Sequence, residues 1–289
     1  MASALYYHCI LSDTDLLRRY VEDGYLVAED LVEASTVEEL RAEIPLFGDG
    51  TYRVTNPPPD PTKILAVHFP HRVSKAILAS IHYPGVVEVL KRIVGAHLPH
   101  WDGRVKCMQS MLFLKPSGFP GQAWHQDERY IPTRDRSLVG AWIALDDATE
   151  TNGCLRVIPG SHRMGRLWPT RAHHHPEEFD LSDEAYGFEE AEETCLEVGA
   201  GSVVFFNGYL LHRSLRNRSD TTRRALVNHY MNSWSNLPWR TGADRMVDAA
   251  IHDNRAVMNV AGEDPYPERG IDEDPGDVFV RPWSDEMPW

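Results

Sequence analysis

The sequence lacks a surplus of basic side chains. Its 289 residues contain 43 Asp and Glu against 29 Lys and Arg, which gives a formal net charge of −14. A molecule of that charge repels phosphate backbones, so the composition argues against a nucleic-acid partner. Long apolar runs are also missing, because no stretch approaches the roughly 18 residues that mark a membrane-spanning helix. We therefore expect no membrane partner.

Cysteine is scarce, and the few cysteines are scattered. None forms a Cys-x-x-Cys pair, and the four positions are Cys9, Cys107, Cys154 and Cys195. This spacing suits reduced thiols better than a disulfide framework. The opening residues MASALYYHCI also lack the cationic start and long apolar stretch of a secretory signal. Together these features predict a cytoplasmic protein.

The composition that is present, with 42% hydrophobic and 25% charged residues, is typical of a globular domain with a sizeable core. Its first hundred residues predict helices. LSDTDLLRRYVEDG indicates a capped helix that ends at Gly24, and YLVAEDLV indicates a short strand after it. STVEELRAEI predicts a second helix, with Ser35 as its cap and Glu38 completing a capping box. YPGVVEVLKRIVG predicts another helix.

From Val105 onward the pattern changes to short runs rich in Val, Ile, Leu, Phe and Trp, separated by Gly, Pro, Asn and Asp. The runs are KCMQSMLFL, SLVGAWIALDD, CLRVIP, TCLEVGAGSVVFFN and RRALVNHYMNSW. Strands at this spacing predict a sandwich or a barrel. We expect one domain over residues 1–289, with a helical part to about 104, a β core over about 105–240 and a C-terminal extension over 241–289. Apolar side chains should dock part of that extension, namely Val278, Val280, Trp283 and Trp289.

The stretch GQAWHQDERYIP places His125 and Asp127 two residues apart. On an extended backbone such residues point to the same side, so both could bind one ion, although the pair alone is also typical of a polar turn. A second histidine from a distant strand would complete the two-histidine, one-carboxylate face of non-haem Fe(II) oxygenases. The best candidate is His212, which follows an apolar strand and an Asn-Gly turn. Taken alone, His212 would be interpreted as a surface-loop histidine.

Oxygenases of this kind commonly use 2-oxoglutarate, whose distal carboxylate requires a cation. Arginine suits that role, because its planar guanidinium pairs with a carboxylate through two hydrogen bonds. Arg223 and Arg224 follow His212 by 11 (223 − 212) and 12 (224 − 212) residues, on a predicted strand. Because neighbouring residues of a strand face opposite sides, only one of them can face the metal. The spacing does not choose between them.

The segment from Arg163 to Glu193 is predicted to be a loop inserted between core strands, a common place for a lid. Its first half could attract an anionic substrate through Arg163, Arg166, Arg171 and His173 to His175. The alternative is a solvated face that the acids of PEEFDLSDE balance. His162 and His229 are predicted to be supporting or structural groups.

Three stretches closely resemble the phytanoyl-CoA dioxygenase (PhyH-like) family of Fe(II)/2-oxoglutarate oxygenases. They are MQSMLFLKPSGFPGQAWHQDERYIP, GAWIALDDATETNGCLRVIPGSH and HRSLRNRSDTTRRALVNHY. The resemblance covers roughly residues 12–240 and is strongest from 109 to 230. It implies a mainly-β fold, the double-stranded β-helix or cupin-like jelly roll, with N-terminal helices flanking it.

The resemblance also implies roles for individual residues. The iron ligands would be His125, Asp127 and His212, and Arg223 would be the arginine that binds 2-oxoglutarate. Further contacts to 2-oxoglutarate would come from Ser214, Met111 and Trp142. Arg213 stands where the family often has Gly, so its bulk either narrows the pocket or points outward. Halogenating relatives have a small residue in place of the carboxylate, so Asp127 favours hydroxylation.

The implied function is an Fe(II)/2-oxoglutarate-dependent dioxygenase. Such an enzyme would use O2 to hydroxylate or otherwise oxidise a C–H bond of a small organic metabolite, releasing succinate and CO2, with ascorbate as a reductant. A non-catalytic or regulatory metal-binding jelly-roll protein would share every motif. A cupin isomerase or hydrolase that binds Zn or Mn could use the same ligands, but it would not need Arg223 and Ser214. The sequence indicates no protein partner.

Overall fold

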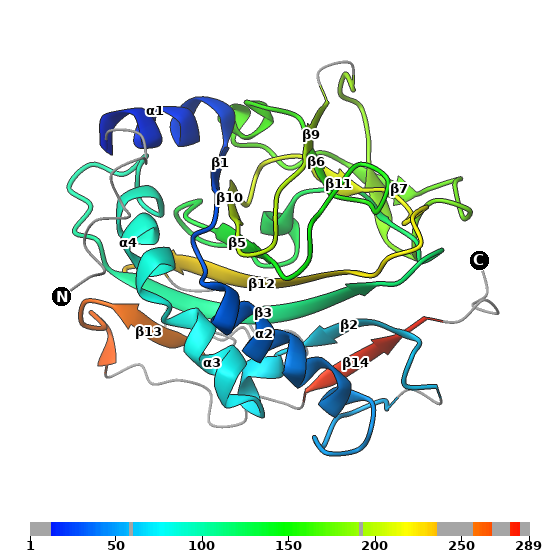
Figure 1. Cartoon of the computed structure of the whole chain (residues 1–289). Helices are drawn as coiled ribbons and strands as arrows, with labels where there is room; N and C mark the ends of the chain where they lie inside the picture. Colours follow the sequence, from blue (N-terminus) through cyan, green and yellow to red (C-terminus); the bar gives the residue numbers. More distant parts are fainter. Residues whose placement is uncertain (1–12, 58–59, 191–192, 236–256, 268–277, 284–289) are drawn as a thin grey trace, which may run out of the picture.

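The computed structural model describes residues 13–57, 60–190, 193–235, 257–267 and 278–283 (Figure 1). The helices are α1 (Asp13–Asp23), α2 (Ala34–Glu43), α3 (Lys75–Ile81) and α4 (Pro84–Ile93). The strands are β1 (Tyr25–Ala28), β2 (Ile64–His68), β3 (Val105–Lys115), β4 (Gln122–His125), β5 (Val139–Ala144), β6 (Leu155–Val157), β7 (Thr170–Ala172), β8 (Asp183–Ala185), β9 (Thr194–Leu196), β10 (Val203–Asn207), β11 (His212–Ser214), β12 (Arg223–Asn232), β13 (Met258–Ala261) and β14 (Phe279–Pro282).

Most of these strands form two antiparallel sheets. The larger sheet has the order β1-β10-β5-β12-β3-β2-β14, with β13 paired to β3, and the smaller has the order β4-β11-β6-β9. Figure 1 shows α2, α3 and α4 on one side of β3 and β12, and β6, β9 and β11 on the other. This arrangement confirms the predicted mainly-β jelly roll with flanking helices.

Residue alternation along β10 shows how the larger sheet serves two cores. Val203 and Phe205 pack in the cluster that includes the helices, whereas Val204 and Phe206 pack with side chains of the smaller sheet. Successive strand residues point to opposite faces, so a continuous apolar run such as VVFF fits a strand that is covered on both sides. One face of the larger sheet therefore anchors the helices, and the other lines the space between the sheets.

The N-terminal helices form largely as their sequences predict. α1 buries Leu16 and Tyr20, although Val21 is 46% exposed, and Gly24 ends the helix with a φ of +83°. α4 begins with Pro84 in its first turn, where a missing N–H costs nothing. α3 follows Ser74, whose hydroxyl accepts a hydrogen bond from the Ile77 amide at 3.1 Å.

The predicted capping box of α2 is wrong. The helix begins at Ala34, so Ser35 is its second residue, and the capping position belongs to Glu33 without a side-chain hydrogen bond. The chain just before this start makes a tertiary contact that local spacing does not reveal, because the Val32 amide donates to the Gly201 carbonyl at 2.9 Å. Glu38 pairs with Arg41 instead of reaching back to the cap.

The larger sheet also extends beyond the predicted core range of about 105–240. β1 and β2 precede that range, and β13 and β14 follow it. Ile64 to Val67 form a buried run without alternation, close to the proline-rich loop, and this pattern did not indicate a strand. Val278, Val280 and Trp283 are buried, which confirms that part of the extension docks; Trp289 lies outside the described residues.

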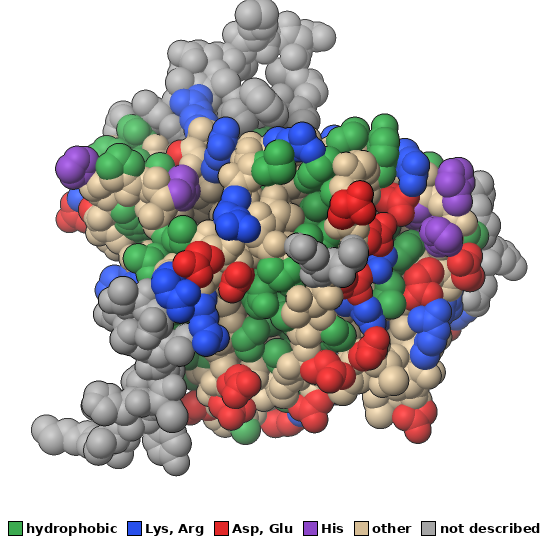
Figure 2. Space-filling view, turned by 90° about the horizontal axis from the view of Figure 1, so that it is seen from above, with side chains coloured by type: hydrophobic (Ala, Val, Ile, Leu, Met, Phe, Trp, Pro, Cys, Tyr) green, Lys and Arg blue, Asp and Glu red, His purple; other side chains and the backbone are tan. Residues whose placement is uncertain are grey.

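The described surface carries charges of both signs, and the described cysteines are free thiols. Acidic and basic side chains are interspersed on the face in Figure 2, and no described helix is long and apolar enough to cross a membrane. Cys107, Cys154 and Cys195 are free thiols, with the sulfurs of Cys154 and Cys195 2.9 Å apart, and Cys9 lies outside the described residues.

Replacing Gly201 by Ala should destabilise the fold more than replacing Gly50. Both glycines have a φ near +90°, which costs another residue roughly 1–2 kcal/mol. A Cβ at Gly201 would also meet the Val32 carbonyl at 2.6 Å, whereas a Cβ at Gly50 would have nothing within 4 Å. Urea unfolding should show an additional loss of about 1–3 kcal/mol in Gly201→Ala. Equal losses in the two variants would contradict this packing.

Candidate active site

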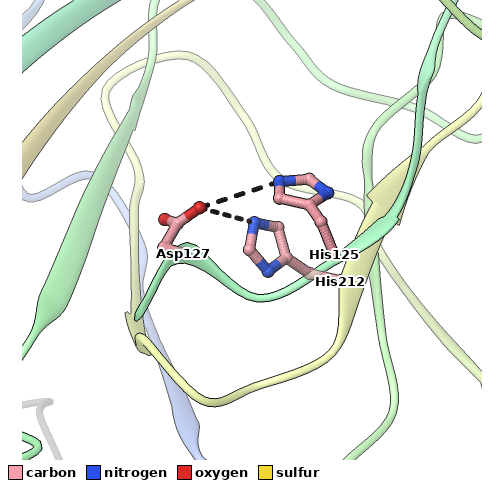
Figure 3. A group of neighbouring side chains, drawn as sticks. All are labelled: His125, Asp127 and His212. Carbon is pink, nitrogen blue, oxygen red and sulfur yellow. Dashed lines mark ion pairs between the residues drawn. The ribbon is translucent and has the colours of Figure 1, made fainter. Parts of the chain in front are cut away.

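His125, Asp127 and His212 lie together in the space between the sheets, as Figure 3 shows. His125 ends β4, and His212 begins β11 directly opposite it in the strand pairing. Asp127 begins a short 3-10 turn (Asp127–Arg129). Its Oδ1 lies 3.7 Å from the Nε2 atom of each histidine, and the three possible ligand atoms are all within 4.8 Å of one another. The structure therefore brings together the three predicted metal ligands.

Hydrogen bonds orient all three side chains. Nδ1 of His125 lies 2.7 Å from the Ala123 carbonyl, and Nδ1 of His212 lies 3.0 Å from the Leu210 carbonyl. Because a carbonyl only accepts, the neutral form of each imidazole carries its proton on Nδ1 and keeps the Nε2 lone pair for a metal. The remaining Asp127 oxygen, Oδ2, is 3.0 Å from Nε2 of His229. This contact is the supporting role that the sequence suggested for His229.

The local electrostatics favour the protonation states that bind a metal. Burial, and secondarily the neighbouring His125, lower the pKa of His212 to about 4. Burial alone would raise the pKa of Asp127, but His212 and His229 outweigh it and hold that pKa well below its usual range. At neutral pH the site therefore presents a neutral His212 imidazole and an ionised carboxylate, which are the forms that bind a cation.

A cavity of about 540 Å³ extends from these ligands between the sheets. Its floor crosses three neighbouring strands of the larger sheet, because Val227 of β12 is paired with Met111 of β3 and with Trp142 of β5. All three side chains line the cavity. Met111 and Trp142 thus line the same cavity as the three possible metal ligands, and their contact with 2-oxoglutarate stays a prediction.

Of the two candidate arginines Arg223 and Arg224, Arg223 lines the cavity. It is only 3% exposed, its Nη2 donates to the Gly153 carbonyl at 3.0 Å, and its guanidinium lies 5.5 Å from the Trp142 ring centre. Arg224 points to the other side, where its Nε and Nη2 atoms each lie 2.6 Å from a carboxylate oxygen of Asp146. The structure thus shows that Arg223, and not Arg224, faces the cavity, a choice that the sequence spacing left open.

Ser214 lies two residues after His212 on β11, and both line the cavity. Its hydroxyl is 2.8 Å from Nζ of Lys115, a residue that the sequence analysis missed. Strand periodicity could have found it, because Lys115 shares a strand face with Met111. Arg213 lies over the Trp124 ring at 4.5 Å and pairs with Glu190 and Glu193, which hold its guanidinium, although Arg213 is still among the residues that line the cavity.

Several basic side chains of the segment between β6 and β9 contact other residues of the same segment. Arg171 pairs with Glu184 across β7 and β8, and Arg166 lies 3.6 Å from the Trp168 ring centre. Nε2 of His173 lies 2.6 Å from the Asp180 carbonyl. None of these residues belongs to the group of possible metal ligands. Part of the segment still reaches the cavity, whose lining includes Asp180 to Asp183.

Comparison with known proteins identifies the family. The model of the family described as phytanoyl-CoA dioxygenase (PhyH) matches residues 20–225. This match covers more than half of the chain, so the chain belongs to the phytanoyl-CoA dioxygenase family, which consists of non-haem Fe(II)/2-oxoglutarate oxygenases. Its His-x-Asp and distal histidine are the ligand pattern expected of that class.

Individual relatives agree with this assignment. The chain is 37% identical over 141 residues to phytanoyl-CoA dioxygenase 1 of Oryza sativa subsp. japonica, which covers 47% of this chain and 50% of the relative. It is 29% identical over 235 residues to the peroxisomal phytanoyl-CoA dioxygenase of Rattus norvegicus, which covers 74% and 67%. The chain spans about half the length of several curated relatives that it matches.

Solved structures share the fold at lower identity. The alpha ketoglutarate dependent epimerase SnoN from nogalamycin biosynthesis superposes with a TM-score of 0.61 at 18% identity, over 82% of this chain and 94% of that one. EctD from S. alaskensis, solved with 2-oxoglutarate and 5-hydroxyectoine, gives a TM-score of 0.61 at 22% identity, over 78% of each chain. These matches support the double-stranded β-helix.

Replacing His229 by Ala should weaken metal binding without removing a ligand. Its imidazole holds Asp127 Oδ2, and the loss of such a supporting contact typically costs 10- to 100-fold in metal affinity. Anaerobic Fe(II) titration followed by calorimetry would measure the change. His162→Ala is the matched control, because the hydrogen bond of the His162 imidazole within the described residues goes to the Val21 carbonyl, at 3.1 Å, and His162 is not among the residues that line the cavity. Unchanged affinity in His229→Ala would contradict the assigned contact.

Proposed function

We propose that this protein is an Fe(II)/2-oxoglutarate-dependent dioxygenase that hydroxylates, or otherwise oxidises, a C–H bond of a small organic metabolite and releases succinate and CO2. The observation that carries the proposal is the convergence of His125, Asp127 and His212 in a cavity that also contains a buried Arg223. Family membership supports the same class of reaction.

The three side chains fit Fe(II). Two neutral imidazole Nε2 atoms and one carboxylate oxygen are the donors that a two-histidine, one-carboxylate iron site uses. All three line a cavity of about 540 Å³, which leaves room for other ligands beside them. Iron bound there would supply the activation of dioxygen, coupled to the oxidative decarboxylation of 2-oxoglutarate.

The chain's own residues would orient 2-oxoglutarate. The buried Arg223 would pair with the distal carboxylate, and Ser214, near Arg223 at the same end of the cavity, would donate its hydroxyl to it. Met111 and Trp142 would flank the carbon chain and exclude water from it. A dry and fixed environment restricts side reactions, so these residues would help to direct oxidation to the substrate.

Size and charge at the cavity bear on the substrate. About 540 Å³ is within the usual range for a small-molecule site, and 2-oxoglutarate would fill part of it. Asp180 and Asp183 line the cavity, and Asp180 is paired with Arg281 at 2.5 Å. Arg171 is already paired with Glu184. The segment between β6 and β9 therefore has less positive charge available for an anionic substrate than its composition suggested. Asp180 is already neutralised by Arg281, which also lines the cavity, so we favour a neutral or cationic group of the substrate next to Asp183.

A regulatory or non-catalytic metal-binding protein is the alternative. It would keep His125, Asp127 and His212, and it would bind metal without consuming 2-oxoglutarate. Incubation with Fe(II), ascorbate, 2-oxoglutarate and a panel of small metabolites separates the two functions. Succinate release that requires His212 supports the enzyme, whereas tight metal binding without succinate release supports the alternative.

Replacing Arg223 by Ala should raise the 2-oxoglutarate concentration required for half-maximal succinate formation. Truncating one partner of a buried charge pair typically costs about 2–5 kcal/mol, which corresponds to roughly 30- to several-thousand-fold in affinity. Arg223→Lys should restore only part of the loss, because an ammonium lacks the planar fork.

Arg224→Ala is the matched control, since Arg224 is the neighbouring residue on the same strand and pairs outside the cavity with Asp146. It should leave the 2-oxoglutarate dependence nearly unchanged, because partly exposed ion pairs contribute about 1 kcal/mol or less. A shift in Arg224→Ala but not in Arg223→Ala would contradict the assigned orientation. No shift in either variant would argue against 2-oxoglutarate as the co-substrate.

A further inference from the structure

Two cysteines contact each other at the β9 end of the smaller sheet. Cys195 is the middle residue of β9, and Cys154 directly precedes β6, the strand that pairs with β9 (Figure 1). Arg156 lies opposite Cys195 in this pairing, so the two cysteines are diagonal neighbours across the strands. Their sulfurs are 2.9 Å apart. The fold therefore brings together two thiols that are 41 residues (195 − 154) apart in the sequence.

The two thiols differ in their access to solvent. Cys154 is 0% exposed and belongs to the apolar cluster that includes Leu155 and Leu196, whereas Cys195 is partly exposed. Burial, and then the hydrogen bond with Cys195, hold the pKa of the Cys154 thiol well above its usual range. Because oxidants attack accessible thiols first, Cys195 is the sulfur that meets an oxidant, and Cys154 is the sulfur next to it.

The third described cysteine has a different environment. Cys107 of β3 is also 0% exposed, but its Sγ donates to the Gln109 carbonyl at 3.6 Å. Within the described residues, Cys154 and Cys195 are the cysteines whose sulfurs contact each other. Neither of them is among the residues that line the cavity. The pair is therefore separate from the possible metal ligands and from the co-substrate contacts proposed above.

We propose that Cys154 and Cys195 form an oxidation site, in which hydrogen peroxide converts the two thiols into one intramolecular disulfide. The Cys195 sulfur attacks one peroxide oxygen, the O–O bond breaks, and a sulfenic acid and one water form. The Cys154 sulfur then attacks the Cys195 sulfur, the S–O bond breaks, and the hydroxyl leaves as a second water with the Cys154 thiol proton. The two sulfurs lose the two electrons that the peroxide gains.

The bond would require only a small movement and would constrain the chain. A disulfide is about 2.05 Å long, so sulfurs that already lie 2.9 Å apart need to approach by about 0.9 Å. The bond would close a covalent loop from Cys154 to Cys195, which contains β6 and the segment between β6 and β9. A cross-link of this kind restricts the unfolded chain, so the oxidised protein should unfold at a higher temperature than the reduced protein.

Mass spectrometry and thermal unfolding of the whole 289-residue chain test the site. The protein carries Cys9→Ser, so that the cysteine outside the described residues takes no part. A stoichiometric amount of hydrogen peroxide should remove two hydrogen atoms from the mass. Digestion without reductant should yield one cross-linked pair of peptides that contain Cys154 and Cys195. The unfolding temperature should rise by roughly 4–8 °C, and dithiothreitol should reverse both changes.

Single variants separate the roles of the two thiols. In Cys154→Ser, Cys195 should stop at the sulfenic acid, which dimedone labels, whereas in Cys195→Ser the buried Cys154 should not be labelled. Cys107→Ser is the matched control, because it removes a buried thiol whose sulfur contacts a carbonyl instead of a cysteine. It should still form the cross-link and keep the rise in unfolding temperature. Cys154→Ala and Cys195→Ala serve for the same comparison if the serine variants do not fold.

The outcomes are decided without the metal or 2-oxoglutarate, so this inference does not rest on the proposed function. If peroxide converts Cys195 to the sulfinic acid without linking it to Cys154, the two sulfurs only pack together, and the inference is wrong. An unchanged mass, or a cross-link that involves Cys107, contradicts it as well. A cross-link between Cys154 and Cys195 that lowers the unfolding temperature would show that the bond does not fit the fold, and would also overturn it.

Discussion

His212 lies directly opposite His125 where β11 pairs with β4, and the geometry of the site depends on this strand pairing. A shift of the register by one residue would turn one of the histidines to the other face of the sheet. Gly121 permits the pairing, because a Cβ at that position would meet the Ser214 carbonyl at 1.9 Å. Ser214 follows His212 by two residues on the same strand, so the same pairing also places Ser214 in the lining of the cavity.

Charge is distributed unevenly along the cavity. Asp127 provides negative charge beside the two histidines and is held by His229, while the buried Arg223, six residues before His229 on β12, provides positive charge. These fixed charges match a metal cation and the distal carboxylate of a keto acid, in that order. Because the side chains are held before any ligand arrives, binding would require little reorganisation.

Much of this fold and site could be predicted from the sequence, because strand alternation and ligand spacing are local properties. Alternation predicted that His125 and Asp127 act together, and the Asn-Gly turn placed His212 near the β core. Choosing Arg223 over Arg224 required the family resemblance, since alternation defines two faces without saying which faces inward. Alternation places Lys115 on the same face as Met111, but its contact with Ser214 joins strands that are distant in the sequence, so spacing did not reveal it. The capping box of α2 failed in the same way, because the chain before that helix makes a tertiary contact, from Val32 to Gly201, that spacing does not reveal.

The central claim is that His125, Asp127 and His212 form an iron site in which 2-oxoglutarate completes the coordination. Anaerobic titration of the protein with Fe(II) and 2-oxoglutarate tests it directly, because a keto acid chelated to Fe(II) produces a visible charge-transfer absorption band. We expect one equivalent of Fe(II) per chain to give the band, and His212→Ala to abolish it. An equally intense band in His212→Ala, or no band in the parent protein at saturating Fe(II) and 2-oxoglutarate, would contradict the account.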